Sequence, residues 1–241
     1  IVGGAHFGLD ENEQAVFHLS SFVRCVPQHE PARRVLGQAL LRAGDPAGAQ
    51  RVLQPLVHDK GVGDAALLAM IGTAALRSGD LESSKTYFQW LADSQPENAA
   101  ARAQLGVVRL DLGEIEEGIA DLETSVAQDP NSSTLALLAT SYMRMGLLDK
   151  AMEAAQKLTH EHPESAVGPT LAGVIHVWRN APDQARAAFQ KARALDPDEP
   201  SVGFNLATLD FNEGNLEGAH QVLLETLQRN PRNPRVLQRL G

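Results

Sequence analysis

The side chains best suited to chemistry are few and scattered. His160, Glu161 and His162 stand side by side and resemble a fragment of a metal site. A helical zinc site places two histidines four residues apart on one face of a helix, whereas these two are separated by one residue and are expected in a loop. His18 and Cys25 lie on one expected helix, two turns apart, which is too far for a catalytic pair. The sequence therefore predicts no metal, no cofactor and no catalytic residue.

A second group of chemically capable residues is acidic. Carboxylates on a helix surface usually remain solvated, and their ion pairs contribute little. We expect a solvated face that is partly paired with Arg109. The acids that gather around this one expected turn are Asp111, Glu114, Glu116, Glu117, Asp121 and Glu123.

The composition limits the class of protein. Of 241 residues, 43% are hydrophobic and only 5% aromatic, and the abundance of alanine and leucine favours closely packed helices. The formal net charge of −9 argues against nucleic acid as a partner, because the phosphate backbone would be repelled. No apolar run is long enough to span a membrane. Cys25 is the only cysteine, so it forms no intrachain disulfide, and we expect a small buried residue.

Residues that end helices recur at a nearly constant interval. Glycine and asparagine tolerate the left-handed backbone that follows a helix, and aspartate does so less readily. Successive positions are 35, 34, 33, 34 and 34 residues apart, and Asp10 lies 34 residues before the first of them. The predicted turn residues are Asp10, Gly44, Gly79, Gly113, Gly146, Asn180 and Gly214.

Other residue types recur at fixed distances from these turns. Small residues allow two helices to approach closely, and proline ends the second helix of a pair. Five residues after the turn stand Ala15, Ala49, Ser84, Gly118, Ala151, Ala185 and Ala219. Seven residues before it stand Gly3, Gly37, Gly72, Gly106, Ala139, Gly173 and Ala207. Seventeen residues after it stand Pro27, Pro96, Pro130, Pro163, Pro197 and Pro231, with Gly61 as the exception.

This period of about 34 residues resembles the tetratricopeptide repeat family. The resemblance implies an all-α fold, a right-handed superhelical solenoid of about seven helix-turn-helix repeats. One departure is that the family's second aromatic, three residues after the first small residue, is kept only as Tyr142. A second departure is that the large aromatic near the start of the first helix is absent, and Arg33, Leu68, Arg102, Leu135, Pro169, Gly203 and Leu237 stand there.

The repeats predict a single array. Its units are 30–64, 65–98, 99–131, 132–165, 166–199 and 200–233, with partial units at 1–29 and 234–241. Asp45 and Asp80 are expected to cap second helices, and Pro46 and Pro182 suit the first turn of such helices. The two ends of the chain fall at the same repeat positions, inside a first helix. We therefore expect a section of a longer array; a complete chain with frayed ends is the alternative.

The resemblance also implies a concave groove lined by first helices, with ligand positions ten, six, three and two residues before each turn. Arg42, Arg77 and Arg144 share one position and are expected to form a basic row, interrupted by Asp111, that suits acidic side chains. Trp178, Phe204 and Phe211 are expected to form an aromatic patch. The alternative is that the arginines are solvated and the aromatics pack between repeats. The candidate binding residues are Arg34, Gln38, Arg42, Thr73, Arg77, Thr140, Arg144, Trp178, Phe204, Thr208 and Phe211.

Three segments narrow the resemblance. They begin at residue 31 with PARRVLGQALLRAGDPAGAQRVLQPLV and continue with QLGVVRLDLGEIEEGIADLETSVAQDP and ARAAFQKARALDPDEPSVGFNLATLDFNEGN. They resemble the TPR-repeat lipoprotein of the PEP-CTERM/exosortase system of exopolysaccharide-producing Gram-negative bacteria. That resemblance implies a periplasmic protein, anchored at the outer membrane through a segment absent here; a cytoplasmic location is the alternative. It also implies a role in assembly or export of exopolysaccharide or of PEP-CTERM proteins.

The sequence therefore predicts a protein-interaction scaffold and not an enzyme. Its partner is expected to be a protein or peptide. A chaperone-tail clamp is not expected, because the corresponding groove positions are mostly alanine, threonine and valine. One alternative is the substrate-docking arm of a larger enzyme such as a glycosyltransferase. Another is direct binding of polysaccharide through the aromatic patch.

Overall fold

The computed structural model describes residues 2–57 and 64–230 and contains helices only in these ranges. The prediction of an all-α repeat fold is confirmed. The chain divides into two compact units, residues 1–128 and 129–241, and each is described by itself. The prediction of a single array stays a prediction. The residues Gly61, Pro231, Leu237 and Gly241 lie outside the described ranges.

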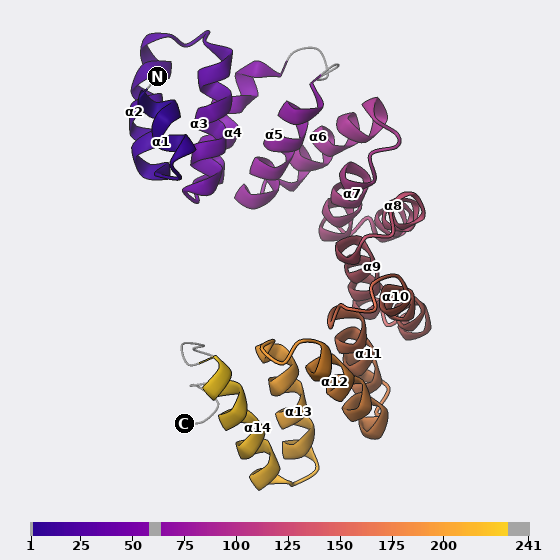
Figure 1. Ribbon diagram of the computed structural model, residues 1–241. Helices are drawn as coiled ribbons and strands as arrows, with labels where there is room; N and C mark the ends of the chain where they lie inside the picture. The colour runs from indigo at the N-terminus through magenta and orange to yellow at the C-terminus, as the bar shows by residue number, and fades with distance from the viewer. Residues whose placement is uncertain (1, 58–63, 231–241) are drawn as a thin grey trace. The chain divides into compact units, whose positions relative to one another are not determined.

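Unit 1 consists of consecutive antiparallel helix pairs (Figure 1), in which the second helix of each pair also packs against the first helix of the next. A short 3₁₀ turn, Gln54–Leu56, extends the end of α4. The helices of unit 1 are α1 Val2–Gly8, α2 Asn12–Cys25, α3 Glu30–Arg42, α4 Pro46–Leu53, α5 Ala65–Ser78, α6 Leu81–Ser94, α7 Ala99–Asp111 and α8 Ile115–Gln128.

Over residues 129–230, unit 2 repeats the same arrangement with three helix pairs. Its first helices α9 and α11 also contact each other directly. The helices of unit 2 are α9 Ser132–Arg144, α10 Leu148–Glu161, α11 Val167–Trp178, α12 Pro182–Leu195, α13 Pro200–Asn212 and α14 Leu216–Arg229.

All seven predicted turn residues have a left-handed backbone. The glycines have φ between 74° and 84°, Asp10 has 63° and Asn180 has 55°. After Gly79, the backbone N–H of Asp80 donates to the carbonyl of Ala75 at 2.9 Å, which closes the end of α5. The turn prediction is therefore confirmed throughout, and a residue with a branched Cβ at these positions would be strained.

The small residues lie where paired helices cross, as the sequence predicted. Every predicted small residue is buried, both at the position five residues after a turn and at the position seven residues before it. In the pair α7–α8, a Cβ added at Gly106 would lie 2.8 Å from the carbonyl oxygen of Gly118, and the reverse distance is the same. In α5–α6 the equivalent Gly72 faces the Phe88 ring instead. These contacts bring the two helices of each pair close together.

The predicted helix starts are also confirmed. The Asp45 carboxylate accepts from the Gly48 N–H at 2.8 Å, and the Asp80 carboxylate accepts from the Ser83 N–H at 3.2 Å. Pro46 and Pro182 are the first residues of α4 and α12. Each cap satisfies one of the N–H groups that a helix start leaves without a partner.

Two expectations for single residues were wrong. Cys25 is exposed rather than buried. It follows buried Val23 by two positions, and two residues rotate the side chain by about 200° around a helix axis. His160 and Glu161 belong to the last turn of α10, and only His162 follows the helix. The helix extends this far because a proline disfavours helical backbone mainly at the residue directly before it.

Candidate functional site

The predicted groove residue Arg34 is held by neighbouring acids. On α3, its guanidinium donates to Glu30 at 2.6 Å and to Asp64, which caps α5. The hydrogen bond with Asp64 raises the pKa of Arg34, and the same bond lowers the pKa of Asp64. Gln38, one turn further along α3, is exposed. Arg34 thus links the first turns of two successive first helices.

Arg42 and Arg77 lie at the ends of α3 and α5, and each contacts the preceding repeat. Arg42 lies 3.3 Å from the Asp10 carboxylate and stacks over the Phe7 ring, with its guanidinium carbon 4.4 Å from the ring centre. Arg77 donates to the carbonyl of Leu41 at 2.9 Å. Arg144 is exposed at the end of α9 in unit 2. The basic row of three arginines stays a prediction.

The threonines of the predicted groove bond to their own helices. The hydroxyls of Thr73 and Thr208 donate to the carbonyls four residues earlier, at 2.7 and 2.8 Å. Thr140 does the same with Ala136, and Thr170 donates to Ala166 at 2.7 Å. Their hydroxyl protons are thus engaged inside the helix.

The aromatic candidates of unit 2 differ in exposure. Trp178 and Phe211 are 54% and 64% exposed, whereas Phe204 is half-buried. Phe204 packs against the cluster of Ala207, Ala219 and Leu223. Two of the three residues therefore offer apolar surface to solvent. The third packs between the two helices of its own repeat, and not between repeats as in the alternative interpretation.

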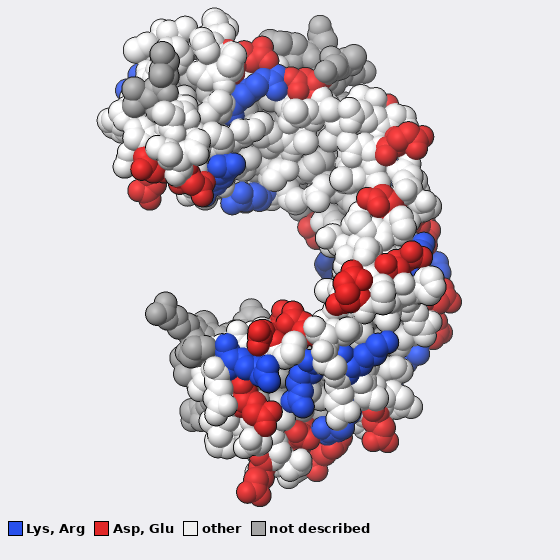
Figure 2. Space-filling model, in the orientation of Figure 1, with Lys and Arg blue, Asp and Glu red and all other residues white. Residues whose placement is uncertain are grey.

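Charge is not concentrated on the surface shown in Figure 2. Most of that surface is uncharged, and basic and acidic side chains lie intermingled on it. In unit 2, Arg186 contacts both Asp210 and Glu213, at 2.9 and 2.8 Å. Such local pairing leaves no single-sign patch on this surface.

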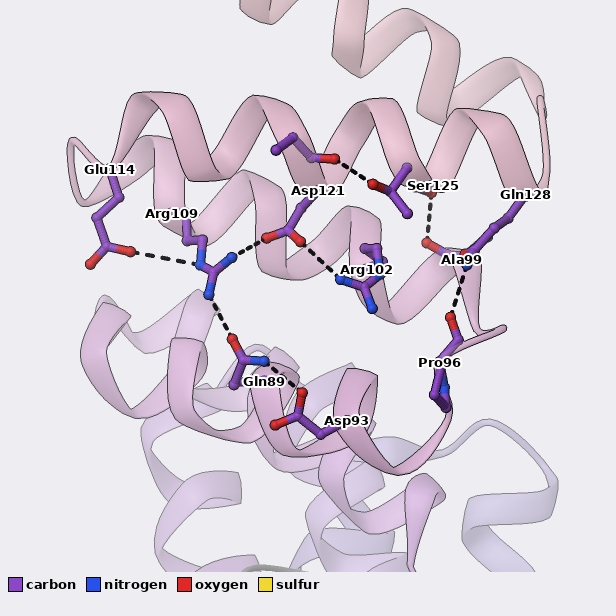
Figure 3. A network of polar contacts seen from close by, with 12 residues as sticks. Gln89, Asp93, Pro96, Ala99, Arg102, Arg109, Glu114, Asp121, Ser125 and Gln128 are labelled. Atoms are coloured by element: carbon purple, nitrogen blue, oxygen red, sulfur yellow. Dashed lines mark hydrogen bonds and ion pairs between the residues drawn. The ribbon is translucent and has the colours of Figure 1, made fainter.

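Sequence reasoning missed a buried polar network in repeat 99–131 (Figure 3). Asp121 on α8, with its side chain only 6% exposed, accepts from Arg109 at 2.6 Å and from Arg102 at 3.2 Å. Arg109 also donates to Gln89 on α6 at 2.6 Å. Asp121 is therefore no part of a solvated acidic face, which corrects that expectation; the pairing with Arg109 is confirmed.

A signal for this network is present in the sequence. Arg102 and Arg109 occupy the two positions at which the tetratricopeptide repeat pattern has aromatic residues. Two cations at sites that face a paired helix require a buried anion, and Asp121 supplies it one turn after Gly118. The two departures from the family pattern in this repeat are thus one structural feature.

One cavity of unit 2 lies beside Gly203, another departure from the family pattern. Above Gly203, which replaces the early aromatic in α13, a cavity of about 360 Å³ is lined by Arg193, Glu225, Thr226 and Arg229 among others. Over the described ranges, no cluster of three or more histidine, cysteine, aspartate or glutamate residues could hold a metal ion. None of the helices described is long and apolar enough to cross a membrane.

Comparisons with known proteins agree with this geometry. Residues 109–172 and 179–240 match one family model described as Tetratricopeptide repeat, and residues 69–133 match a second with the same description. Among solved structures, the chain is similar to the C-terminal part of a TPR repeat-containing protein from Cytophaga hutchinsonii, with a TM-score of 0.67 and 13% identity over 99% of this chain and 98% of that one. At this identity the likeness concerns the fold alone.

Two relatives are similar in sequence. The type IV pilus assembly protein PilF of Pseudomonas aeruginosa is 27% identical over 174 residues, which are 69% of this chain and 68% of that protein. The BBSome complex member bbs-4 of Caenorhabditis elegans is 23% identical over 200 residues, which are 82% of this chain but only 42% of that protein.

Proposed function

Because this chain belongs to the tetratricopeptide repeat family, we propose that it is a protein-interaction scaffold, a single array of helical hairpins that binds a partner along its first helices. The observation that carries the proposal is the exposure of Trp178 and Phe211 at two of the family's ligand positions. Large apolar side chains of this kind are the usual anchors of protein interfaces. The two relatives named above include a component of a protein complex and an assembly protein.

The test compares partner capture by matched variants. Affinity purification from cells that make the native protein is expected to lose the partner with Phe211→Ala and to retain it with Leu216→Ala. Leu216 is 62% exposed but lies on a second helix. Arg77→Glu is expected to weaken capture if unit 1 contributes. Equal capture by all three variants, each with an unchanged helical spectrum, would remove the first helices from the binding surface.

The finer role that we propose is in assembly or export of exopolysaccharide or of PEP-CTERM proteins, in the periplasm and with an outer-membrane anchor. It rests on the resemblance of three segments to the TPR-repeat lipoprotein of that system. The similarity to a protein named for type IV pilus assembly supports an assembly role of this general kind. Fractionation of the producing cell tests it, since recovery of the protein in the cytoplasm would contradict the proposed location.

A second candidate ligand is polysaccharide, because exposed aromatic rings such as Trp178 and Phe211 also stack on sugars. Titration of the chain with the native exopolysaccharide is then expected to change Trp178 fluorescence. No change at saturating polymer would leave protein as the partner. The docking arm of a glycosyltransferase is a further version of the scaffold function, and a catalytic domain in the same gene would support it.

A further inference from the structure

On the first helices of unit 2, three of the four ligand positions hold no charged residue. Positions ten, six and three residues before a turn follow an i, i+4, i+7 spacing, so they share one side of a helix. The spacing places this side next to the buried side that faces the second helices. We call it the first-helix face of unit 2. Its residues are Ala136, Thr140, Met143, Thr170, Val174, Val177, Phe204, Thr208 and Phe211, of which Met143 is buried.

The polar residues of this face are threonines whose hydroxyl protons are already engaged. Thr140, Thr170 and Thr208 each donate to the carbonyl four residues earlier in the same helix. They direct methyl groups and oxygen lone pairs away from that bond. The face therefore combines apolar side chains with hydroxyls that have no second proton to donate.

A bound chain must bury its own backbone groups against this surface. An extended peptide would bring N–H and C=O groups into contact with valine and phenylalanine, and each group buried there without a hydrogen bond would weaken binding. An α-helix satisfies those groups internally and presents only side chains. The hydrogen-bonding capacity of the face therefore favours a helical partner segment.

The absence of charge at these positions gives a second constraint on the partner. None of the nine positions is charged, and the fourth ligand position is charged only on α9, where it holds Arg144. An acidic or basic side chain placed over α11 and α13 would therefore lose its hydration without gaining an ion pair at these positions. The corresponding positions of unit 1 differ, because they include Arg34 and Gln38. We propose that the first-helix face of unit 2 binds the apolar, uncharged side of an α-helical partner segment, and not an extended or acidic peptide.

This inference rests on the proposed scaffold function and deepens it. The contact would centre on Val177 and Phe211, which are exposed, and on Trp178, which directly follows Val177. Phe204 and Val174 lie deeper, packed against apolar clusters of α13 and its neighbours. Aliphatic side chains along one side of a partner helix would then cover this exposed apolar surface, which continues into the apolar clusters.

Trp178 provides a direct readout. The chain has two tryptophans, and Trp90→Phe leaves Trp178 as the only one. Two synthetic probes are compared, each of about 18 residues or five helical turns. One is a helix-forming peptide with leucines at i, i+3, i+4 and i+7 and uncharged polar residues elsewhere. The other has the same leucine content with prolines that keep it extended. An acidic variant of the helix serves as a third probe.

The helical probe is expected to shift Trp178 emission to shorter wavelength, with an affinity that changes less than about twofold between low and high salt because no ion pair is formed. Phe211→Ser is expected to weaken binding at least about tenfold. Leu216→Ser, an exposed leucine of the same unit on a second helix, is expected to change it less than about twofold. The extended and acidic probes are expected to bind at least about tenfold more weakly.

Different failures have different meanings. Preferential binding of the extended or acidic probe, abolished by Phe211→Ser, would overturn the helical partner while leaving the scaffold function in place. Equal sensitivity to Phe211→Ser and Leu216→Ser would show that the probe binds apolar surface without regard to this face. If no probe binds and Phe211→Ala also leaves native partner capture unchanged, both this inference and the proposed binding surface are wrong.

Discussion

Two neighbouring repeats of unit 1 fill the same three positions with opposite chemistry. The positions lie eleven and four residues before the turn and eight residues after it. In repeat 65–98 they hold Leu68, Ala75 and Tyr87, all buried in one apolar cluster. In repeat 99–131 they hold Arg102, Arg109 and Asp121, which form the ionic network. Both helix pairs cross at a glycine, so one backbone arrangement accommodates either set.

The two repeats differ in how their side chains combine to stabilise the fold. In repeat 65–98 each apolar side chain contributes by its own buried area. In repeat 99–131 the residues act as a set, because each charge is tolerated only while its partners are present. The arginine side chains retain exposures of 25% and 22%, which lowers the cost of burial. Their Nε atoms are nevertheless buried without a hydrogen bond, so the set is not fully satisfied.

The largest expected effect comes from removing the shared anion. Asp121→Ala leaves Arg102 without this carboxylate and Arg109 with the more distant Glu114, at 3.7 Å. We expect the free energy of unfolding to fall by about 3 kcal/mol, at the low end for a broken buried pair because both arginines keep some water. Urea denaturation followed by circular dichroism measures it. Glu117→Ala on the exposed side of α8 is the control, with an expected change below about 0.5 kcal/mol. Similar midpoints for both variants would mean that the network contributes nothing.

The glycine at each crossing provides the next comparison. Gly106→Ala is expected to cost about 2 kcal/mol, because the new methyl would lie 2.8 Å from a backbone carbonyl that cannot rotate away. Gly72→Ala is expected to cost less, since its methyl would meet the Phe88 ring at 3.1 Å and a ring can tilt. Thermal melts of the two variants rank them. The reverse order would mean that side-chain packing, not the backbone, sets the distance between helices.

The sequence predicted the frame of the fold because its key residues act locally. A left-handed turn at Gly79 or Asn180 depends on one residue's backbone freedom. A close crossing at Gly106 or Ala139 requires a small side chain whatever the neighbours are. Each of these requirements recurs seven times, so an exception at one position does not hide the period.

The side-chain network was not predicted because it depends on pairs distant in sequence. In the sequence Asp121 stands among surface acids, and only its place opposite Arg102 and Arg109 makes it buried. The exposure of Cys25 follows from its angle to buried Val23 around the axis of α2, whereas the expectation of burial rested on residue type alone. The groove residues were located by position alone, so the internal hydrogen bonds of the threonines could not be foreseen.

A smaller loss of stability is expected when Asp80, at the start of α6, is replaced. Asp80 caps this helix and accepts from the Gln50 side chain at 2.7 Å. Hydrogen bonds from Ser83 and Gln50 lower the pKa of Asp80. Its stabilising effect is therefore present above the ordinary pKa of about 3.8 and is lost as the pH falls towards the lower folded value. Asp80→Ala is expected to cost about 1 kcal/mol at neutral pH.

The pH dependence of that loss separates a cap from a packing residue. The gap between the wild-type and Asp80→Ala denaturation midpoints is expected to narrow as the pH falls below 3.8. A gap that stays constant to low pH would assign the effect to packing. The equivalent residue in repeat 99–131 is Glu114, which contacts Lys85 at 2.7 Å and Arg109 at 3.7 Å instead.

The smallest net effect is expected when the whole ionic set is exchanged for the apolar one. The triple variant Arg102→Leu, Arg109→Ala and Asp121→Tyr gives repeat 99–131 the residues of repeat 65–98. Replacing a complete buried ionic group with apolar residues is often neutral or stabilising, so we expect a free energy of unfolding within about 1 kcal/mol of the wild type. The three single substitutions should then sum to a much larger loss than the triple variant shows. An additive result would mean that the arginines and Asp121 contribute independently, and the two repeats would then differ in composition but not in how their side chains cooperate.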